Sequence, residues 1–173
     1  MPINKDCYNT FKQLLFVIVF ALLTYTSFGQ TPDLPKRKSV YFELGGSGGI
    51  GSINYEKLFY TKNTSEFTWR AGISLAPIDK NNGTGLVFPL LINTLLGKNA
   101  HKLELGLGQG ITLTTKGSFF ALTTAAIGYR YQSKNRKWFY RITYTPLVSY
   151  IADFQVQHWE GISIGYTLTP KAK

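Results

Sequence analysis

The sequence predicts an all-β fold: an eight-stranded antiparallel up-and-down transmembrane β-barrel, preceded by a cleavable signal peptide. Three observations lead to this prediction. Three copies of the dipeptide Lys-Asn are spaced by 36 residues, at Lys62, Lys98 and Lys134, and a fourth copy stands at Lys80. Apolar and polar residues alternate between these breaks, as they do in strands. A short apolar run stands near the start of the chain.

Residues 1–29 have the pattern of a secretory signal peptide. Lys5 and Lys12 form a basic start, residues 14–23 are apolar, and small residues precede a cleavage point ahead of Gln30. The apolar run is shorter than the roughly 20 residues that a spanning helix needs. We therefore expect export and cleavage, with an uncleaved amino-terminal anchor as the alternative.

Composition narrows the chemistry of the exported chain. Cys7, the only cysteine, lies ahead of the apolar run, so the exported part has no disulfide, thiol nucleophile or thiolate metal site. The net charge of +10 could suggest that the protein binds nucleic acid, but we exclude this partner because an exported protein is separated from it. Many lysines fall in predicted turns or near the ends, where they would meet water or anionic lipid. We expect no cofactor and no metal site.

The rest of the chain divides into a periplasmic lead-in (30–38), one barrel (39–169) and a basic tail (170–173). The expected strands are residues 40–47, 50–60, 66–76, 85–96, 102–114, 118–132, 137–148 and 158–167. The three Lys-Asn breaks at Lys62, Lys98 and Lys134 follow every second strand and would be short periplasmic turns, whereas Lys80 falls in another connection. The other connections, residues 46–51, 77–84, 115–117 and 149–157, would be outer loops.

Each expected strand has an apolar, aromatic face and a small or polar face. In the third, Trp69 and Ile73 lie opposite in phase to Arg70 and Ser74. The polar face is rich in Gly, Ser and Thr and lacks the charge density of a wetted surface, so we expect the apolar face to point outward to lipid. A soluble periplasmic, calycin-like barrel that holds an apolar ligand is the alternative, and it requires the opposite orientation. Pro89 predicts a bulge or an irregular fourth strand.

Aromatic residues gather near the Lys-Asn turns, where an interfacial girdle would lie. The predicted girdle comprises Tyr55, Phe59, Trp69, Tyr129, Trp138 and Tyr140.

Six charged residues share the polar phase and should meet inside the barrel. They are Glu43, Glu56, Arg70, Glu104, Arg130 and Arg141. An eight-stranded barrel has just enough interior for its own side chains, and buried charges there must pair. We interpret them as a structural network that plugs the lumen, with a gate for small solutes as the alternative.

Catalytic residues are not evident. His158 and Glu160, with Asp153 and Ser149 nearby, are the outer-loop candidates for a lipid A-modifying enzyme, a third hypothesis. The glycine-rich segments 45–49 and 106–110 precede no helix, so we interpret them as a tight hairpin and as strand residues that relieve crowding.

Several segments resemble small outer-membrane β-barrel proteins of Bacteroidota, which are similar in architecture to OmpA- and OmpX-like barrels. The resemblance lies in residues 40–48 (VYFELGGSG), 52–56 (SINYE), 89–106 and 161–166 (GISIGY). It implies a monomer in the cell outer membrane, with outer-membrane lipid, lipopolysaccharide and the barrel-assembly machinery as partners and a structural or surface-interaction role. Residues 169–173 (TPKAK) depart from the aromatic ending common in such chains.

Overall fold

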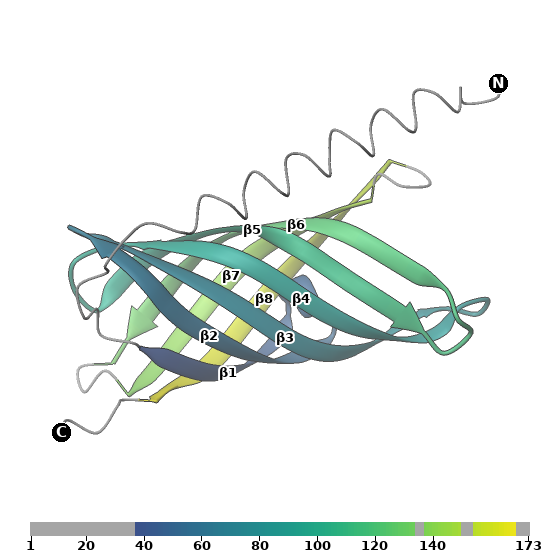
Figure 1. Cartoon of the computed structure of the whole chain (residues 1–173), viewed down its shortest axis with the longest axis horizontal. Helices are drawn as coiled ribbons and strands as arrows, with labels where there is room; N and C mark the ends of the chain where they lie inside the picture. The colour runs from purple at the N-terminus through teal and green to yellow at the C-terminus, as the bar shows by residue number, and fades with distance from the viewer. Residues whose placement is uncertain (1–36, 134–136, 150–153, 169–173) are drawn as a thin grey trace, which may run out of the picture. The chain divides into compact units, whose positions relative to one another are not determined.

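The computed structural model describes residues 37–133, 137–149 and 154–168, which form a closed antiparallel barrel of eight strands in sequence order (Figure 1). No helix among these residues is long and apolar enough to cross a membrane. The elements are β1 (Lys38–Gly45), the short 3-10 helix η2 (Gly46–Gly48), β2 (Gly51–Lys62), β3 (Ser65–Asp79), β4 (Gly83–Leu96), β5 (His101–Thr114), β6 (Phe119–Gln132), β7 (Trp138–Ser149) and β8 (Gln155–Leu168).

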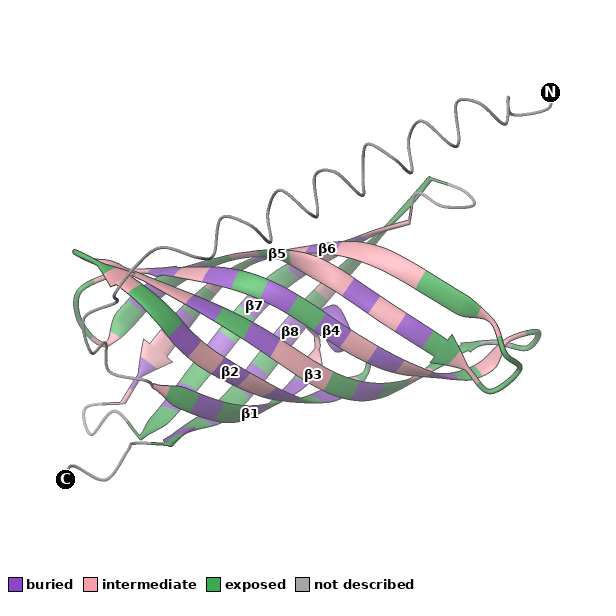
Figure 2. Ribbon diagram, viewed as in Figure 1, coloured by how far each residue is buried: buried purple, intermediate pink, exposed green. Residues whose placement is uncertain are grey.

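The orientation of the strand faces confirms that the apolar face points outward. Along β7 the exposed fractions of Tyr140 and Ile142 are 49% and 62%, whereas Arg141 and Thr143, which alternate with them, are almost fully buried. The same alternation runs around the barrel (Figure 2). The soluble alternative required the Leu, Trp and Tyr faces to point inward, and that requirement is not met.

The first Lys-Asn break is a tight turn, as expected. Asn63 has φ 54°, a left-handed conformation that Asn tolerates better than most residues. Lys62 and Ser65 are paired across this turn. The second break lies between β4 and β5, while Lys134 and Asn135 lie outside the described residues. We call this end of the barrel the Lys-Asn end, and the other the distal end.

The predicted distal loops were wrong in length. Residues 77–79 and 83–84 of one expected loop belong to β3 and β4, and residues 155–157 of the other belong to β8. The β3–β4 and β7–β8 hairpins project past the β1–β2 connection in Figure 1. The Gly45–Gly49 hairpin is also not a simple tight turn, because β1 ends at Gly45 and residues 46–48 form a buried helical turn.

Pro89 does not produce the bulge that the sequence suggested. It pairs with Gly110 of β5 within an unbroken register. On the β3 side the ladder is interrupted at Phe88 and Pro89, between the pairs Ala71–Leu90 and Ser74–Val87, so the strand is irregular there although the register is the same on both sides. The bulges of this region lie instead between Leu58 and Tyr60 in β2 and near Pro77 in β3.

Candidate functional site

The six charged residues of the polar phase lie together in the interior. Each is at most 1% exposed, although they come from β1, β2, β3, β5, β6 and β7. The strand alternation explains their direction, because each shares its parity with inward-facing Ser, Thr or Gly neighbours. We call Glu43, Glu56, Arg70, Glu104, Arg130 and Arg141 the charge cluster.

Arg141 is the centre of the charge cluster. Its Nη2 lies 2.6 Å from Oε1 of Glu43, and its Nη1 lies 2.8 Å from Oε1 of Glu104. Arg70 Nη1 is 3.6 Å from the same Glu43 oxygen. Two acids and two bases, in the order Arg70, Glu43, Arg141 and Glu104, are therefore connected by consecutive contacts in the lumen.

The partners in the charge cluster are not the neighbours in the sheet. Glu56 is directly opposite Arg70 in the β2–β3 ladder, yet both of its oxygens accept hydrogen bonds from Nη1 of Arg130 on β6, at 2.8 and 3.0 Å. Arg130 also approaches Glu104 at 4.0 Å. The contact of Glu56 with Arg130 therefore reaches across the lumen between strands that share no ladder, whereas Glu104 and Arg130 lie on the adjacent strands β5 and β6.

Two inward aromatic rings support the arginines. Tyr41 accepts a hydrogen bond from Arg70 at 2.8 Å, and its ring lies 4.4 Å from the Arg141 guanidinium. The Arg130 guanidinium stacks 3.8 Å above Phe139. Such cation–π contacts stabilise buried guanidinium groups. Sequence reasoning missed these rings, although Tyr41 shares the phase of Glu43 and Phe139 that of Arg141.

A second charged group lies nearer the Lys-Asn end. Glu66 pairs with Arg37 at 2.6 Å and also with Lys102. Glu66 is 20% exposed, so this group is less enclosed than the charge cluster. It was not predicted, but the parity of Glu66 with Arg70 and of Lys102 with Glu104 was a sufficient signal.

The β1–β2 connection folds into the barrel and adds to its filling. Gly46, Ser47 and Gly48 are buried, and Ser47 Oγ accepts a hydrogen bond from Nη2 of Arg70 at 2.6 Å. Ser74 Oγ donates to the carbonyl of Gly48 at 2.6 Å. We call residues 46–48 the inner loop. Because Arg70 contacts both Glu43 and Ser47, it connects the charge cluster to the inner loop.

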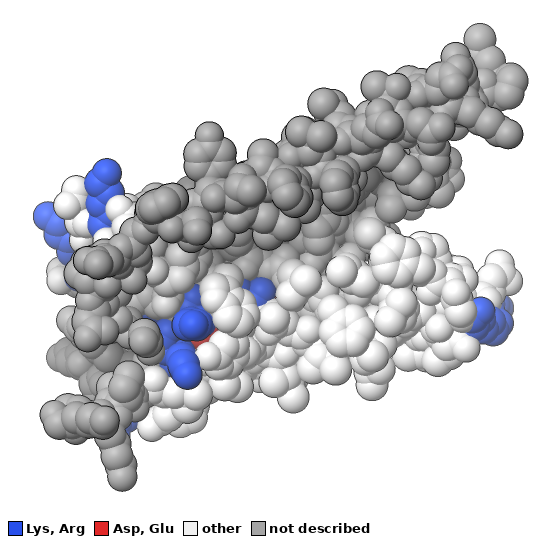
Figure 3. All heavy atoms as spheres, in the orientation of Figure 1, with Lys and Arg blue, Asp and Glu red and all other residues white. Residues whose placement is uncertain are grey.

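Most of the predicted girdle residues form contacting pairs on the outer face. Tyr55 and Trp69 have ring centroids 5.5 Å apart, and Trp138 meets Tyr166 edge-on at 5.2 Å. Phe59, Tyr129 and Tyr140 are exposed. On the face seen in Figure 3, a broad uncharged surface separates the Lys and Arg side chains near the two ends of the barrel.

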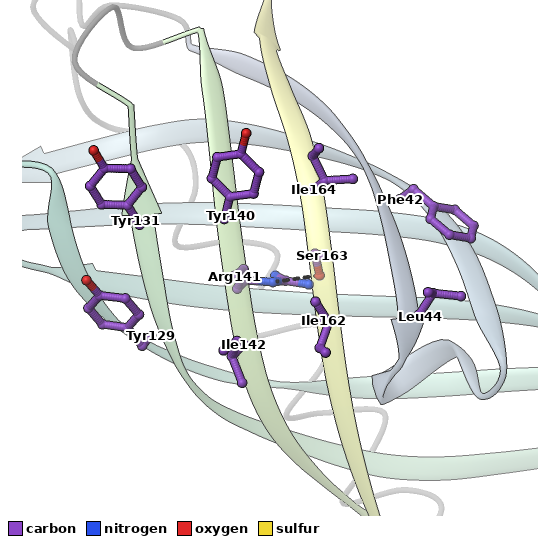
Figure 4. Close-up of a pocket in the computed structure, with 10 residues that line it drawn as sticks. All are labelled: Phe42, Leu44, Tyr129, Tyr131, Tyr140, Arg141, Ile142, Ile162, Ser163 and Ile164. Atoms are coloured by element: carbon purple, nitrogen blue, oxygen red, sulfur yellow. Dashed lines mark hydrogen bonds between the residues drawn. The ribbon is translucent and has the colours of Figure 1, made fainter.

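A shallow groove of about 290 Å³ runs over the outer face of β8. Two rows of paired residues cross four strands there, with Ile164 between Tyr140 and Phe42 and Ile162 between Ile142 and Leu44 (Figure 4). The rows are Tyr131, Tyr140, Ile164, Phe42 and Tyr129, Ile142, Ile162, Leu44. Arg141 and Ser163, which also line the groove, are buried, and the exposed lining is apolar apart from the tyrosine hydroxyls, so this groove belongs to the outer apolar surface.

The outer-loop candidates are not assembled into a catalytic set. His158 stacks on Tyr144 and shares a 2.5 Å hydrogen bond with its hydroxyl. Glu160 is opposite Tyr144 in the ladder, on the exposed face, while Ser149 pairs with Gln155. Asp153 lies outside the described residues. Within the described ranges, no group of three or more His, Cys, Asp or Glu residues could hold a metal ion.

Comparison with known proteins supports the fold. The chain is similar to the N-terminal β-barrel domain of Pseudomonas aeruginosa OprF, with a TM-score of 0.54 and 8% identity over 76% of this chain and 96% of that one. It is also similar to Ail, the attachment invasion locus protein of Yersinia pestis, with a TM-score of 0.47 and 10% identity over 78% of this chain and all of that one. No protein-family model and no curated protein matches the sequence.

Proposed function

We propose that the protein is an integral outer-membrane β-barrel with a plugged lumen and a structural or surface-interaction role. The observation that carries the proposal is the inverted distribution of side chains. Ile142 and Ile162 are more than 60% exposed at mid-strand, whereas Arg70, Arg130 and Arg141 are buried. Water outside the barrel would make this arrangement unfavourable, because exposed apolar area costs about 25 cal/mol per Å². Hydrocarbon outside the barrel makes it favourable.

The charge cluster would close the lumen rather than line an open channel. It holds three acids and three bases, all at most 1% exposed, so its formal charge is balanced. Each buried ion costs several kcal/mol to desolvate unless it is paired, and the cross-lumen contacts supply the pairing. Opening the lumen would require these contacts to break together.

Export would follow from the signal peptide at residues 1–29, and insertion would depend on the barrel-assembly machinery. The barrel would act as a monomer in contact with outer-membrane lipid and lipopolysaccharide. The resemblance to small Bacteroidota barrels supports this setting. The girdle at the Lys-Asn end would lie at the periplasmic interface of the membrane.

Fractionation of cells that express the full chain tests the location. We expect the protein in the outer-membrane fraction, with a gel mobility that changes on heating because a folded barrel resists detergent until it is boiled. Quantitative release with the soluble periplasm would refute the proposal.

Planar bilayer recordings test the plugged lumen. The wild-type protein should carry no steady current, and the double variant Arg70→Ala, Arg130→Ala should conduct. It removes the nearest base of Glu56 and leaves Glu43 with Arg141 as its ion-pair partner. Lys62→Ala, in an exposed turn, is the matched control. Steady wild-type current, or no difference between the double variant and the control, would contradict closure by the charge cluster.

A further inference from the structure

The distal rim of the barrel is uneven. β8 pairs with β1 only from Gly161 to Leu168, and the described ladder partners of residues 155–160 are all on β7. On the other side, β3 pairs with β2 as far as Ser74, and residues 75–79 have their ladder partners on β4. A notch therefore lies above the short β1–β2 hairpin, with a strand edge on each side (Figure 1).

The inner loop explains why the notch stays open. Gly45 and Gly46 have φ values of 71° and 77°, which turn the chain away from the line of β1. A Cβ at Gly45 would lie 2.0 Å from the carbonyl oxygen of Glu160, which marks the last close contact between β1 and β8. Beyond it the chain enters the lumen rather than continuing the wall.

The backbone of β8 offers hydrogen-bonding groups to the notch. Thr167 donates its N–H to the carbonyl of Lys137, on the β7 side. Backbone groups alternate in direction along a strand, and β8 has no register shift against β7 or β1. The N–H and C=O groups of Val156 and His158 and the N–H of Glu160 therefore point to the notch, while the Glu160 carbonyl lies against Gly45.

The facing edge on β3 is blocked. The carbonyl of Thr64 accepts from Gly97 on the β4 side, so the opposite parity, which includes Leu75 and Pro77, faces the notch. Pro77 has no N–H to offer, and the register shifts beside it. Proline and bulges are the usual devices that protect an exposed edge from pairing. The β8 edge carries neither.

The side chains beside the open edge add a charge preference. Glu160 is exposed at the floor of the notch and has no ion pair within the described part of the chain. The His158 ring is engaged with Tyr144, so it does not cover the edge. A carboxylate at this place favours a Lys or Arg on an incoming strand.

We propose that the β8 edge over residues 156–160 binds one extended strand of a partner protein, which adds to the sheet beside β8 and carries a basic residue opposite Glu160. Main-chain hydrogen bonds would supply the affinity and Glu160 the selectivity. This inference depends on the strand registers. Its test is therefore independent of whether the barrel inserts into a membrane and of whether its lumen is closed.

The probe is a fluorescent synthetic peptide of alternating Val and Thr with one Lys, added to the refolded full-length barrel in detergent and followed by anisotropy. A matched peptide that is N-methylated at every residue has no N–H to donate from either edge. We expect saturable binding of the first peptide and none of the second. Replacement of the Lys by Glu, or Glu160→Gln in the barrel, should weaken binding severalfold.

Variants of the barrel locate the site. His158→Pro removes an N–H that points to the notch and should weaken binding about tenfold or more. His158→Ala keeps that N–H and should bind like wild type, and Leu75→Pro on the blocked edge should also have no effect. Val156→Pro replaces His158→Pro if the latter loses the heat-modifiable gel shift of the folded barrel.

Three results would overturn the proposal. The first is no saturable binding to the wild-type barrel. The second is equal binding by wild type and every folded proline variant of β8. The third is a wild-type dimer in light scattering that the β8 proline variants abolish, because the edge would then be occupied by a second copy of the chain.

Discussion

The two halves of the lumen are filled in different ways. Toward the Lys-Asn end, long charged side chains such as Arg130 and Arg141 meet across the interior. Toward the distal end, β5 contributes only Gly106, Gly108 and Gly110 to the inward face over three successive positions, and the inner loop lies in this space: a Cβ at Gly110 would be 3.9 Å from the Ser47 carbonyl. A narrow barrel can thus be closed by side chains or by backbone, and Arg70 connects the two.

Removal of Arg141 should have the largest effect on stability. It would show that the half of the lumen filled by charged side chains is more sensitive to substitution than the half filled by the inner loop. Arg141→Ala leaves Glu43 and Glu104 without their closest base, so we expect a loss of about 3–5 kcal/mol in the free energy of unfolding. Urea titration of the barrel in lipid vesicles, with Lys62→Ala as control, measures it. A loss as small as that of the control would mean that the charge cluster contributes little to stability.

A pair of glycine variants tests the packing in the distal half of the barrel, where the inner loop lies. A Cβ at Gly108 would lie 2.0 Å from the carbonyl oxygen of Leu90, whereas at Gly110 the nearest atom is 3.9 Å away. We expect Gly108→Ala to lower the unfolding free energy by about 1–3 kcal/mol, from overpacking, and Gly110→Ala to change it little. Equal effects of the two variants in the same titration would contradict this local difference.

Ser47→Ala tests the connection between the halves. It removes the hydrogen bond from Arg70 to the inner loop, and we expect a loss of about 1–2 kcal/mol because the donor is charged and keeps its contacts with Tyr41 and Glu43. Hydrogen exchange at the amides of residues 48–50 should become faster while exchange in β7 stays unchanged. Uniform acceleration across the barrel would indicate that the loop is not an independent unit.

Tyr129→Phe should have the smallest effect and serves as the outer-face reference. It removes the hydroxyl that contacts His101 on an exposed surface, and such changes usually stay within about 0.5 kcal/mol. An effect comparable to that of Ser47→Ala would mean that the outer aromatic contacts stabilise the barrel as much as its interior does.

The strand number could be predicted from the 36-residue spacing of the Lys-Asn breaks. The side-chain period of two placed Trp69 and Arg70 on opposite faces, and the low charge density of the polar face indicated that it points inward. The same phase brought the six charges to the interior. The pairing of Glu56 with Arg130 could not be predicted, because it depends on strand tilt and stagger around the closed barrel. The inner loop was missed because glycines with positive φ are compatible with both a tight hairpin and an inward turn.

The strand order also bears on how the barrel folds. Every pair of neighbouring strands except one is consecutive in sequence, so each of these pairs can form early as a local hairpin. The exception is β1 with β8, where Ser39 meets Thr167 across 128 residues of chain. The conformational entropy of the chain between β1 and β8 is lost last, when these two strands pair. Arg141 and Glu43 can form their ion pair fully only after that pairing. Barrel closure and assembly of the buried ions should therefore be one kinetic event.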